Sequence, residues 1–306
     1  MNYREYAKKY KKISYYDQIR NNKIKSWVLL ITIVVLIVLL MLFISAIFDA
    51  SAVFVFLIIG IIISLVYVWI GFYYSDKIAL FSVKAYKAED KKFNHLNNIV
   101  EGLALAGGLP KPKVYVMPSK EINAFATGRN PQNAIICVTE GALEKLNDKE
   151  LEGVLAHEMT HIKNYDIRFV TLAVILVGFI AIISEIFLRS LWFTSENQDN
   201  NNVIFLIIGI ALAILAPIVA NLVQLAISRK REYMADAGAV QLTKDNSGLI
   251  SALKKIQSYY STHKKTIANK TVSNMFIASP LTKKSITNLF STHPPIEDRI
   301  KVLEAM

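Results

Sequence analysis

The sequence predicts a predominantly helical α+β fold in an integral membrane protein with four transmembrane helices. Two observations support this prediction. Four stretches are nearly free of charge and reach the ~20 residues that a helix needs to cross a bilayer. The polar segments between and around them have ordinary globular composition and contain both strand-like and helix-like patterns. The four apolar stretches are 27–48, 53–74, about 169–188 and 203–227.

These stretches divide the chain into five parts. A basic N-terminal segment (1–26) precedes a transmembrane hairpin (27–74). A second transmembrane hairpin (169–227) separates the two parts of one soluble domain, 75–168 and 228–306. The sequence leaves open whether the second hairpin crosses the membrane fully or forms a tighter hairpin.

The first apolar stretch is expected to be an uncleaved anchor. It precedes Ala50-Ser51-Ala52, which resembles the cleavage site of a secretory signal. However, its 22 residues exceed the ~7–15 of a signal core, and a second apolar stretch follows at once. Both features favour a membrane span over a signal peptide.

The placement of charge predicts the orientation in the membrane. The formal net charge is +11, yet the connections 49–52 and 190–202 contain no lysine or arginine. By the positive-inside rule, the basic segments 1–26, 75–168 and 228–306 lie in the cytoplasm of a multi-pass cell-membrane protein. Because the lysines flank the apolar stretches, anionic membrane lipid explains them more simply than nucleic acid, and no nucleic-acid partner is expected.

The soluble part is predicted to combine a small sheet with a following helix. Gly107-Gly108 and Pro110 end a first helix. The only cysteine, Cys137, lies in an apolar run and is expected to be a packed thiol in a reducing compartment. The predicted elements are a helix over 88–106, a strand over 113–116 and a β-hairpin over 122–128 and 134–141.

The next helix carries the chemistry. Asn147 is a good N-cap, and Glu150 three residues later can complete a capping box. Further along, His157 and His161 are four residues apart, so both imidazoles lie on one face and can bind one zinc ion. Glu158, next to the first histidine, can reach water in the open coordination position and act as general base.

A catalytic zinc site needs a third protein ligand. Asn164 and Ile167 stand where the metzincin pattern has glycine and histidine, which excludes that class. Glu232 and Asp236 share a helix face beyond the fourth apolar stretch. Glu232 can be the third ligand, with Asp236 accepting a hydrogen bond from a ligand histidine. Spacing equally allows Glu232 to pair with nearby arginines on a solvated face.

The remaining polar candidates allow more than one interpretation. His293 and Arg299 lie in a His-Pro-Pro segment, where Arg299 can simply pair with a carboxylate. Alternatively, either residue lies near the zinc and stabilises an oxyanion or holds a peptide. Glu185 and Arg189 near the outer end of the third stretch are expected to be a structural pair. His95 and His263 are expected at the surface.

Several separate stretches resemble, in the same order, the HtpX family of bacterial membrane zinc endopeptidases over nearly the full chain. They are INAFATG, HEMTHIKNYD, SRKREYMADAGAV, NMFIASPL and LFSTHPPIEDRI. The resemblance implies a cytoplasmic gluzincin-type zinc protease domain with His157, His161 and Glu232 as ligands of one Zn²⁺. It further implies Glu158 as the general base and Asp236 as the partner of a ligand histidine. No catalytic position departs from the family pattern.

The resemblance also implies how substrates bind. The hairpin around Asn123 and 135–139 borders the cleft, where an extended polypeptide can add as a strand. Asn123, His293 and Arg299 are candidates for contacts with the substrate or the oxyanion. The implied substrates are misfolded or damaged membrane proteins and unfolded polypeptides, cleaved at the cytoplasmic face in quality control and stress.

Two other functions fit the same residues less well. A protease for lipidated C-terminal peptides, like the eukaryotic prenyl-protein proteases, encloses its site in more spans than four. An inert membrane scaffold or holdase has no need of Glu158, which is present. A zinc metalloendopeptidase is therefore predicted, while its oligomeric state and cleavage preference do not follow from the sequence.

Overall fold

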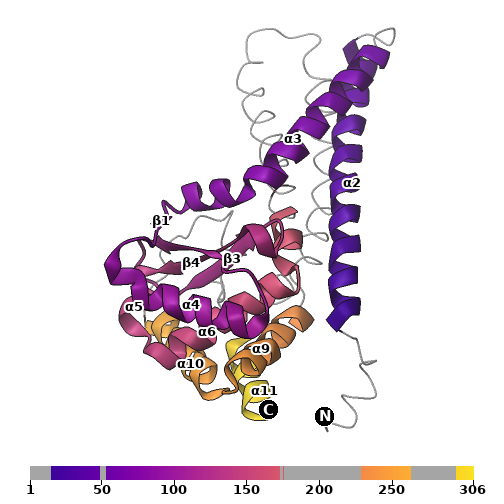
Figure 1. The fold of residues 1–306 in the computed structure, drawn as a ribbon. Helices are drawn as coiled ribbons and strands as arrows, with labels where there is room; N and C mark the ends of the chain where they lie inside the picture. Colours follow the sequence, from indigo (N-terminus) through magenta and orange to yellow (C-terminus); the bar gives the residue numbers. More distant parts are fainter. Residues whose placement is uncertain (1–14, 49–52, 173–174, 176–228, 263–293) are drawn as a thin grey trace.

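The computed structural model describes residues 15–48, 53–172, 175, 229–262 and 294–306 (Figure 1). Within these residues the fold is α+β and mainly helical, as the sequence predicts. The helices are α2 (Tyr15–Phe48), α3 (Val53–Ser82), α4 (Asn94–Gly107), α5 (Glu140–Lys145), α6 (Asp148–Lys163), α9 (Arg229–Thr243), α10 (Ser247–Thr262) and α11 (Ile296–Glu304). The strands are β1 (Tyr86–Lys87), β2 (Lys113–Met117), β3 (Ala124–Gly128) and β4 (Ala134–Thr139), and η2 (Lys91–Phe93) and η3 (Pro131–Asn133) are 3-10 turns.

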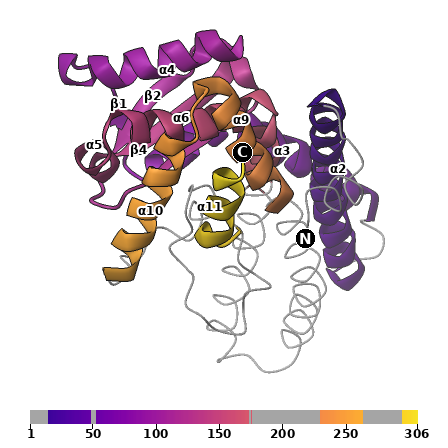
Figure 2. The ribbon, with the colours of Figure 1, turned by 90° about the horizontal axis from the view of Figure 1, so that it is seen from below.

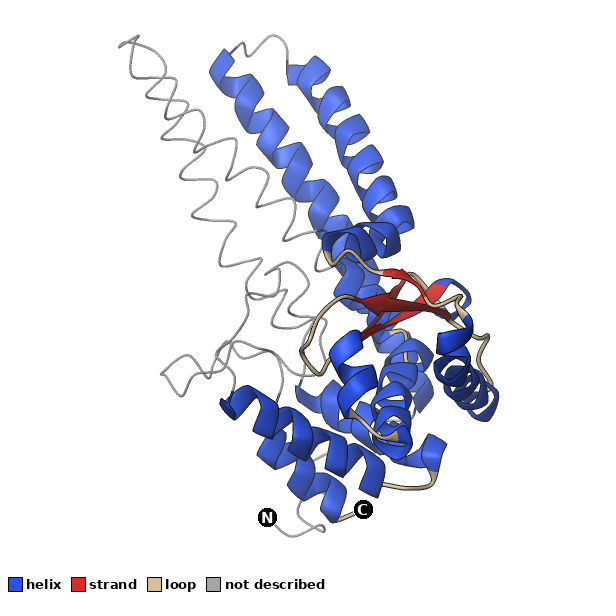
Figure 3. Cartoon of the chain, turned by 90° about the vertical axis from the view of Figure 1, so that its left-hand side faces the viewer, coloured by secondary structure: helices blue, strands red, loops and turns tan. Residues whose placement is uncertain are grey.

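Helices α2 and α3 form the first predicted hairpin and stand out from the rest of the fold (Figures 1 and 3). Each contains a segment long and apolar enough to cross a membrane, Arg20–Leu39 and Leu57–Ser82. Large apolar side chains stay exposed along both helices, with Ile31 at 58% and Trp69 at 55% exposure. Apolar surface of this extent suits contact with lipid.

Both helices are longer than the apolar stretches that predicted them. Helix α2 begins at Tyr15, inside the basic segment, and α3 continues past residue 74 to Ser82. The transmembrane bounds at residues 27 and 74 stay a prediction, since both helices extend beyond them. Hydropathy marks the part of a helix that suits lipid, whereas lysine, arginine and glutamine flanking it are good helix formers and prolong it.

Several expectations lie outside the described residues, so the count of four spans stays a prediction. They are the third apolar stretch except residues 169–172 and 175, the whole fourth stretch, the pair Glu185 and Arg189, and the histidines His263 and His293.

The sheet has the strand order β1-β2-β4-β3. Strands β3 and β4 pair antiparallel, which confirms the predicted hairpin, whereas β2 and β4 run parallel. Gly128 in β3 has φ of 135°, and a β-carbon at this position would collide with the Asn133 carbonyl. Only glycine therefore fits there. Within the described residues, β3 has no neighbouring strand on its other side. This edge of the sheet contacts α6.

Both faces of the sheet are covered. The end of α3 packs on one face, where Ala79 and Leu80 contact Phe125, Ile135 and Cys137 in a buried cluster. The Cys137 thiol is 1% exposed, which confirms its predicted packing. Helices α4 and α6 pack on the other face, and α9, α10 and α11 enclose α6 (Figures 1 and 2).

The first helix of the soluble part begins later than expected. Ala88 donates its backbone N–H to the Val114 carbonyl, and η2 follows before α4 starts at Asn94. The predicted start at residue 88 is therefore wrong, because the segment first pairs with the sheet edge. The predicted end is confirmed, since Gly108 adopts the left-handed conformation with φ of 64° and caps α4.

Candidate metal centre

Helix α6 is held at its start by the predicted capping box. The Asn147 side chain accepts the backbone N–H of Glu150, and the Glu150 carboxylate accepts the N–H of Asn147. Lys255 and Ser251 of α10 also donate to this carboxylate, at 2.7 and 2.6 Å. Local and tertiary contacts thus fix the register of α6.

Helix α9 crosses α6 at close range because of one glycine. A β-carbon at Gly238 would collide with the side chain of Thr160 on α6. The absence of a side chain there lets the two helices approach. As a result Glu232, nearly two turns before Gly238, comes to lie against the histidines of α6.

Three side chains converge inside the protein. The Nε2 atoms of His157 and His161 are 3.2 Å apart. Each lies 3.6 Å from one carboxylate oxygen of Glu232. A tetrahedral zinc ion with bonds of about 2.0–2.1 Å places its ligand atoms about 3.3–3.4 Å apart. The separations therefore match one four-coordinate ion, and these three residues form the described group that could hold a metal.

The hydrogen bonds of the two rings make this cluster electron-rich. The Nδ1 atom of His157 lies 2.9 Å from Asp236, and that of His161 lies 3.0 Å from Asp166. An ionised carboxylate only accepts, so each Nδ1 carries the proton and each Nε2 turns a lone pair inward. Two lone pairs and the Glu232 carboxylate then face one another, an arrangement suited to binding a cation.

The carboxylates around the two histidines raise the pKa of both rings. Burial and the nearby Arg299 guanidinium lower the pKa of His157, but Asp236 and Glu232 outweigh them and raise it to about 9. For His161, burial opposes and Asp166 and Glu232 favour the charged form, so its pKa is raised. The pocket therefore stabilises positive charge, which suits a zinc ion.

Glu158 lies at the sheet edge beside the cluster. It is 3% exposed, and the backbone N–H of Ala126 in β3 donates to its carboxylate. Burial raises its pKa, while the neighbouring histidines and this hydrogen bond act in the opposite direction. A carboxylate with a raised pKa is suited to accept and return a proton near neutral pH.

Arg299 of α11 also reaches the cluster. Its guanidinium is fully buried and donates to both oxygens of Asp236, at 2.6 and 2.9 Å. Arg299 therefore pairs with a carboxylate, and its guanidinium also lies 3.3 Å from Nδ1 of His157 and 3.8 Å from the Glu232 carboxylate. Its contact with an oxyanion or a peptide stays a prediction. Asp236 holds the predicted place beside a ligand histidine.

Asn123 is buried and bonds to side-chain and backbone groups outside the three-residue cluster. It is 1% exposed, its amide nitrogen lies 3.2 Å from the Tyr260 hydroxyl, and its amide oxygen accepts the N–H of Ala124. Its role as a contact for substrate stays a prediction.

Asp166 is a site residue that the sequence did not predict. Helix α6 ends at Lys163, Tyr165 takes a left-handed φ of 60°, and the chain is helical again from Asp166. This break costs about 1–2 kcal/mol for a residue other than glycine. It turns the Asp166 carboxylate back to His161, whereas an uninterrupted helix would carry it around to another face. The left-handed Tyr165 leaves no recognisable signal in the sequence.

A helix with two histidines one turn apart, a glutamate beside them and a carboxylate from a later helix defines a metal-dependent hydrolase. The sequence model of peptidase family M48 matches residues 90–306, more than half of the chain. The protein therefore belongs to peptidase family M48, whose members are metalloproteases.

Similar proteins agree with this assignment. The chain is 48% identical to the "Protease HtpX homolog" of Caldanaerobacter subterraneus over 82% of the chain and 84% of that protein. It is 40% identical to the homologue of Dictyoglomus turgidum over 97% and 96% of the two chains. The crystal structure of Ste24p from S. mikatae shares the fold, with a TM-score of 0.53 at 20% identity over 94% of this chain and 66% of that one.

Proposed function

We propose that the protein is a membrane-bound zinc endopeptidase. The observation that carries this proposal is the buried meeting of His157, His161 and Glu232 at zinc-ligand separations, with Glu158 beside them. These three residues would hold one Zn²⁺. Zinc, when bound there, polarises a carbonyl and lowers the pKa of water towards ~7.

Glu158 moves the proton in this mechanism. Its carboxylate accepts a proton from the attacking water and donates it to the leaving amine. Burial, which raises its pKa, favours this exchange. Asp236 and Asp166 keep both histidines in the tautomer that binds metal through Nε2.

The edge of β3 binds the substrate in an extended conformation. The Asn123 carbonyl accepts the Thr139 N–H, so these two residues form a hydrogen-bonded pair of the β3–β4 ladder. Because such pairs alternate along an antiparallel ladder, Ala124 and Ala126 turn their carbonyls away from β4, while their N–H groups bond to the Asn123 amide oxygen and to Glu158. A polypeptide whose N–H groups bond to these carbonyls runs past Glu158 and close to His157, His161 and Glu232.

The proposed setting follows the charge pattern and the helices. Helices α2 and α3, with the two apolar stretches outside the described residues, anchor a multi-pass protein in the cell membrane. The N-terminus and the catalytic domain lie in the cytoplasm. There the enzyme cleaves misfolded or damaged membrane proteins and other unfolded polypeptides, in contact with membrane lipid. His293 stays a candidate for contact with the oxyanion.

A cleavage assay tests the proposal. Purified full-length protein is incubated with an unfolded polypeptide such as casein, with and without a metal chelator. Removing a general base costs about 10²–10⁴-fold in rate, so Glu158→Gln is expected to abolish measurable cleavage. Glu152→Gln, which makes the same change six residues earlier on α6, is the matched control and is expected to cleave normally. Equal cleavage by Glu158→Gln and wild type, or activity that the chelator leaves untouched, rules the peptidase mechanism out.

A further inference from the structure

The first membrane helix reaches the metal centre through one buried side chain. Asn22 of α2 is 3% exposed although it lies in the basic segment before the apolar stretch. Its amide nitrogen donates to the Asp166 carboxylate at 2.7 Å and to the Asn164 carbonyl at 2.9 Å. Both acceptors lie more than 140 residues further along the chain.

These contacts form a chain of hydrogen bonds from Asn22 through Asp166 to His161. One oxygen of Asp166 accepts from Asn22, and the other accepts from Nδ1 of His161 at 3.0 Å. The second donation satisfies the carbonyl of Asn164, where α6 ends, and the ammonium of Lys23 lies 4.5 Å from the Tyr165 ring. Helix α2 therefore contacts each of the three residues that form the break after α6.

We infer that Asn22 is a positioning residue of the metal centre, through which the first membrane helix orients Asp166 and so the His161 ring. The inference rests on the proposed zinc site. Partners of ligand histidines contribute about 10–100-fold in metal affinity, because they fix the ring and its tautomer. Asn22 acts on such a partner from the far side and is expected to contribute at the lower end of that range.

Zinc affinity of the purified full-length protein tests this inference without using proteolysis. Metal-free protein is titrated with Zn²⁺ against a fluorescent chelator. Asn22→Leu keeps the approximate size but loses both donors, and it is expected to weaken binding about tenfold. Ser26→Ala is the matched control, because Ser26 is also buried on α2 but, among the residues that the structure describes, its hydroxyl bonds to the Asn22 carbonyl of the same helix and not to Asp166. It is expected to bind zinc as wild type does.

A double variant separates positioning from general stability. Once Asp166→Asn has broken the link to His161, adding Asn22→Leu is expected to cause no further loss of zinc affinity. Losses that multiply in the double variant, or an Asn22→Leu affinity within twofold of wild type, overturn the inference. His157→Ala in the same titration reports on the proposed zinc site itself, so failure of that site is distinguishable from failure of the Asn22 link.

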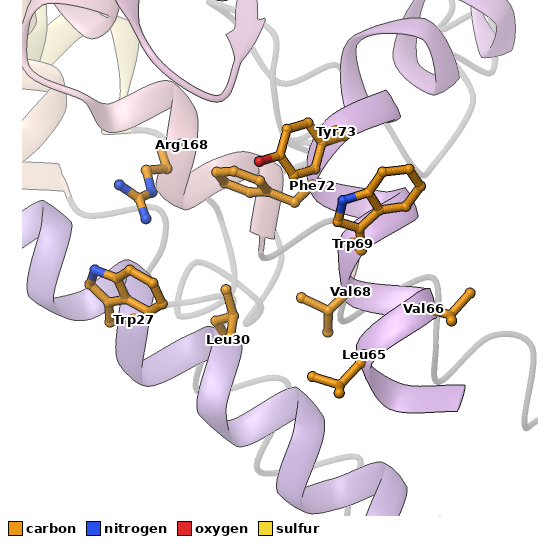
Figure 4. Close-up of a pocket in the computed structure, with 9 residues that line it drawn as sticks. All are labelled: Trp27, Leu30, Leu65, Val66, Val68, Trp69, Phe72, Tyr73 and Arg168. Atoms are coloured by element: carbon orange, nitrogen blue, oxygen red, sulfur yellow. The ribbon is translucent and has the colours of Figure 1, made fainter. Parts of the chain in front are cut away.

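A second inference concerns a groove between α2 and α3. It has a volume of about 510 Å³ and is almost entirely apolar, with Trp27 and Leu30 on α2 and Leu65 and Trp69 on α3 (Figure 4). Arg168 supplies its only charge among the described lining residues. Figure 4 shows the guanidinium at one end of the groove, across from Trp27, with Leu65 towards the other end.

The charge of Arg168 has no opposite charge among the described residues. Its guanidinium carbon lies 5.6 Å from the Trp27 ring and 5.4 Å from the Phe72 ring. Its buried Nε has no hydrogen-bond partner, and no carboxylate of the described chain pairs with it. Burial lowers its pKa, and the nearby Tyr165 acts in the opposite direction.

The geometry points to an anionic phospholipid as the ligand of this groove. Its phosphate binds Arg168, and an acyl chain follows Leu30 and Leu65 along the apolar part. Trp27 stands where α2 passes from basic to apolar sequence, the level at which tryptophan marks the membrane interface. A phosphate at this level has its chains at the depth of the groove.

Lipid retention by the full-length protein tests this assignment. The protein is reconstituted with equal amounts of phosphatidylglycerol and phosphatidylcholine, extracted in mild detergent, and its bound lipids are counted by native mass spectrometry. Wild type is expected to retain phosphatidylglycerol, and Arg168→Gln is expected to retain about tenfold less, as for one lost charge-assisted bond. Arg20→Gln, the same change at an exposed site of α2, is expected to behave as wild type.

Filling the groove gives an independent check. Leu30→Trp occupies the space for the acyl chain and is expected to remove the retained lipid while leaving Arg168 in place. Equal retention of both lipids by wild type, or equal retention of phosphatidylglycerol by Arg168→Gln and Arg20→Gln, overturns the assignment.

Discussion

The pair of Asp236 and Arg299 links stability to metal binding, and one substitution separates the two effects. Asp236→Asn keeps the size of the side chain but removes its charge. Arg299 is fully buried and donates to both oxygens of Asp236. Breaking a buried ion pair by removing one partner costs about 3–5 kcal/mol, because the other charge loses its closest partner. The next carboxylate, that of Glu232, lies further away, at 3.8 Å from Nη1 of Arg299. For a chain of this size, that loss of stability corresponds to roughly 6–20 °C in Tm.

The same substitution also acts on His157. Asp236 lies 2.9 Å from Nδ1 of His157, so zinc affinity is expected to fall about 10–100-fold. Thermal unfolding in detergent with a chelator present measures the first effect, and zinc titration measures the second. Adding Arg299→Met to Asp236→Asn removes the guanidinium that has lost its closest carboxylate. The double variant is expected to recover most of the lost stability but not the zinc affinity. The loss of stability is also measured for Asp236→Asn and for Arg299→Met alone. If the double variant loses as much stability as these two single variants together, within about 0.5 kcal/mol, Asp236 and Arg299 do not act as a pair, which would contradict this prediction.

Three further predictions concern packing, pH and the thiol. Gly238→Ala is expected to lower both Tm and zinc affinity, because its β-carbon collides with Thr160, and Thr160→Ala is expected to restore part of both. The pKa of Glu150 is lowered: burial opposes ionisation, but the bonds from Lys255, Ser251 and the capping box outweigh it. The stability that Glu150 supplies is therefore present above its unfolded pKa of about 4.3 and is lost as the pH falls through the lower folded value. Glu150→Gln should cost about 1–2 kcal/mol near pH 7, and unfolding curves that show the same difference at pH 3 would contradict this origin. Burial raises the pKa of the Cys137 thiol, so iodoacetamide is expected to label it only after unfolding, and rapid labelling of native protein would disprove its packing.

The parts of the fold that the sequence predicted depend on local periodicity. Asn147 and Glu150 form a capping box three residues apart, and His157 and His161 share a helix face four residues apart. The β-hairpin is likewise local, since a short turn joins two apolar runs. Each of these features is complete within one or two turns of chain, so its pattern is visible in the sequence.

The features that the sequence did not predict depend on contacts between distant residues or on an unusual backbone conformation. Asp166 faces His161 only because Tyr165 adopts a left-handed conformation, and no residue type at 164–166 requires that break. Asn22 meets Asp166 across 144 residues of sequence. For Arg299 the sequence allowed two roles and named no partner, and only the packing of α11 on α9 brings it to Asp236. Such contacts form through tertiary packing, which local sequence patterns do not predict.

The central claim is that His157, His161 and Glu232 hold one zinc ion. X-ray absorption at the zinc edge of the purified full-length protein tests it most directly. The account predicts one zinc per chain with only nitrogen and oxygen neighbours at about 2.0–2.2 Å, including two imidazoles, and a changed shell in Glu232→Ala. A zinc content far below one per chain, or a shell that Glu232→Ala leaves unaltered, would contradict it.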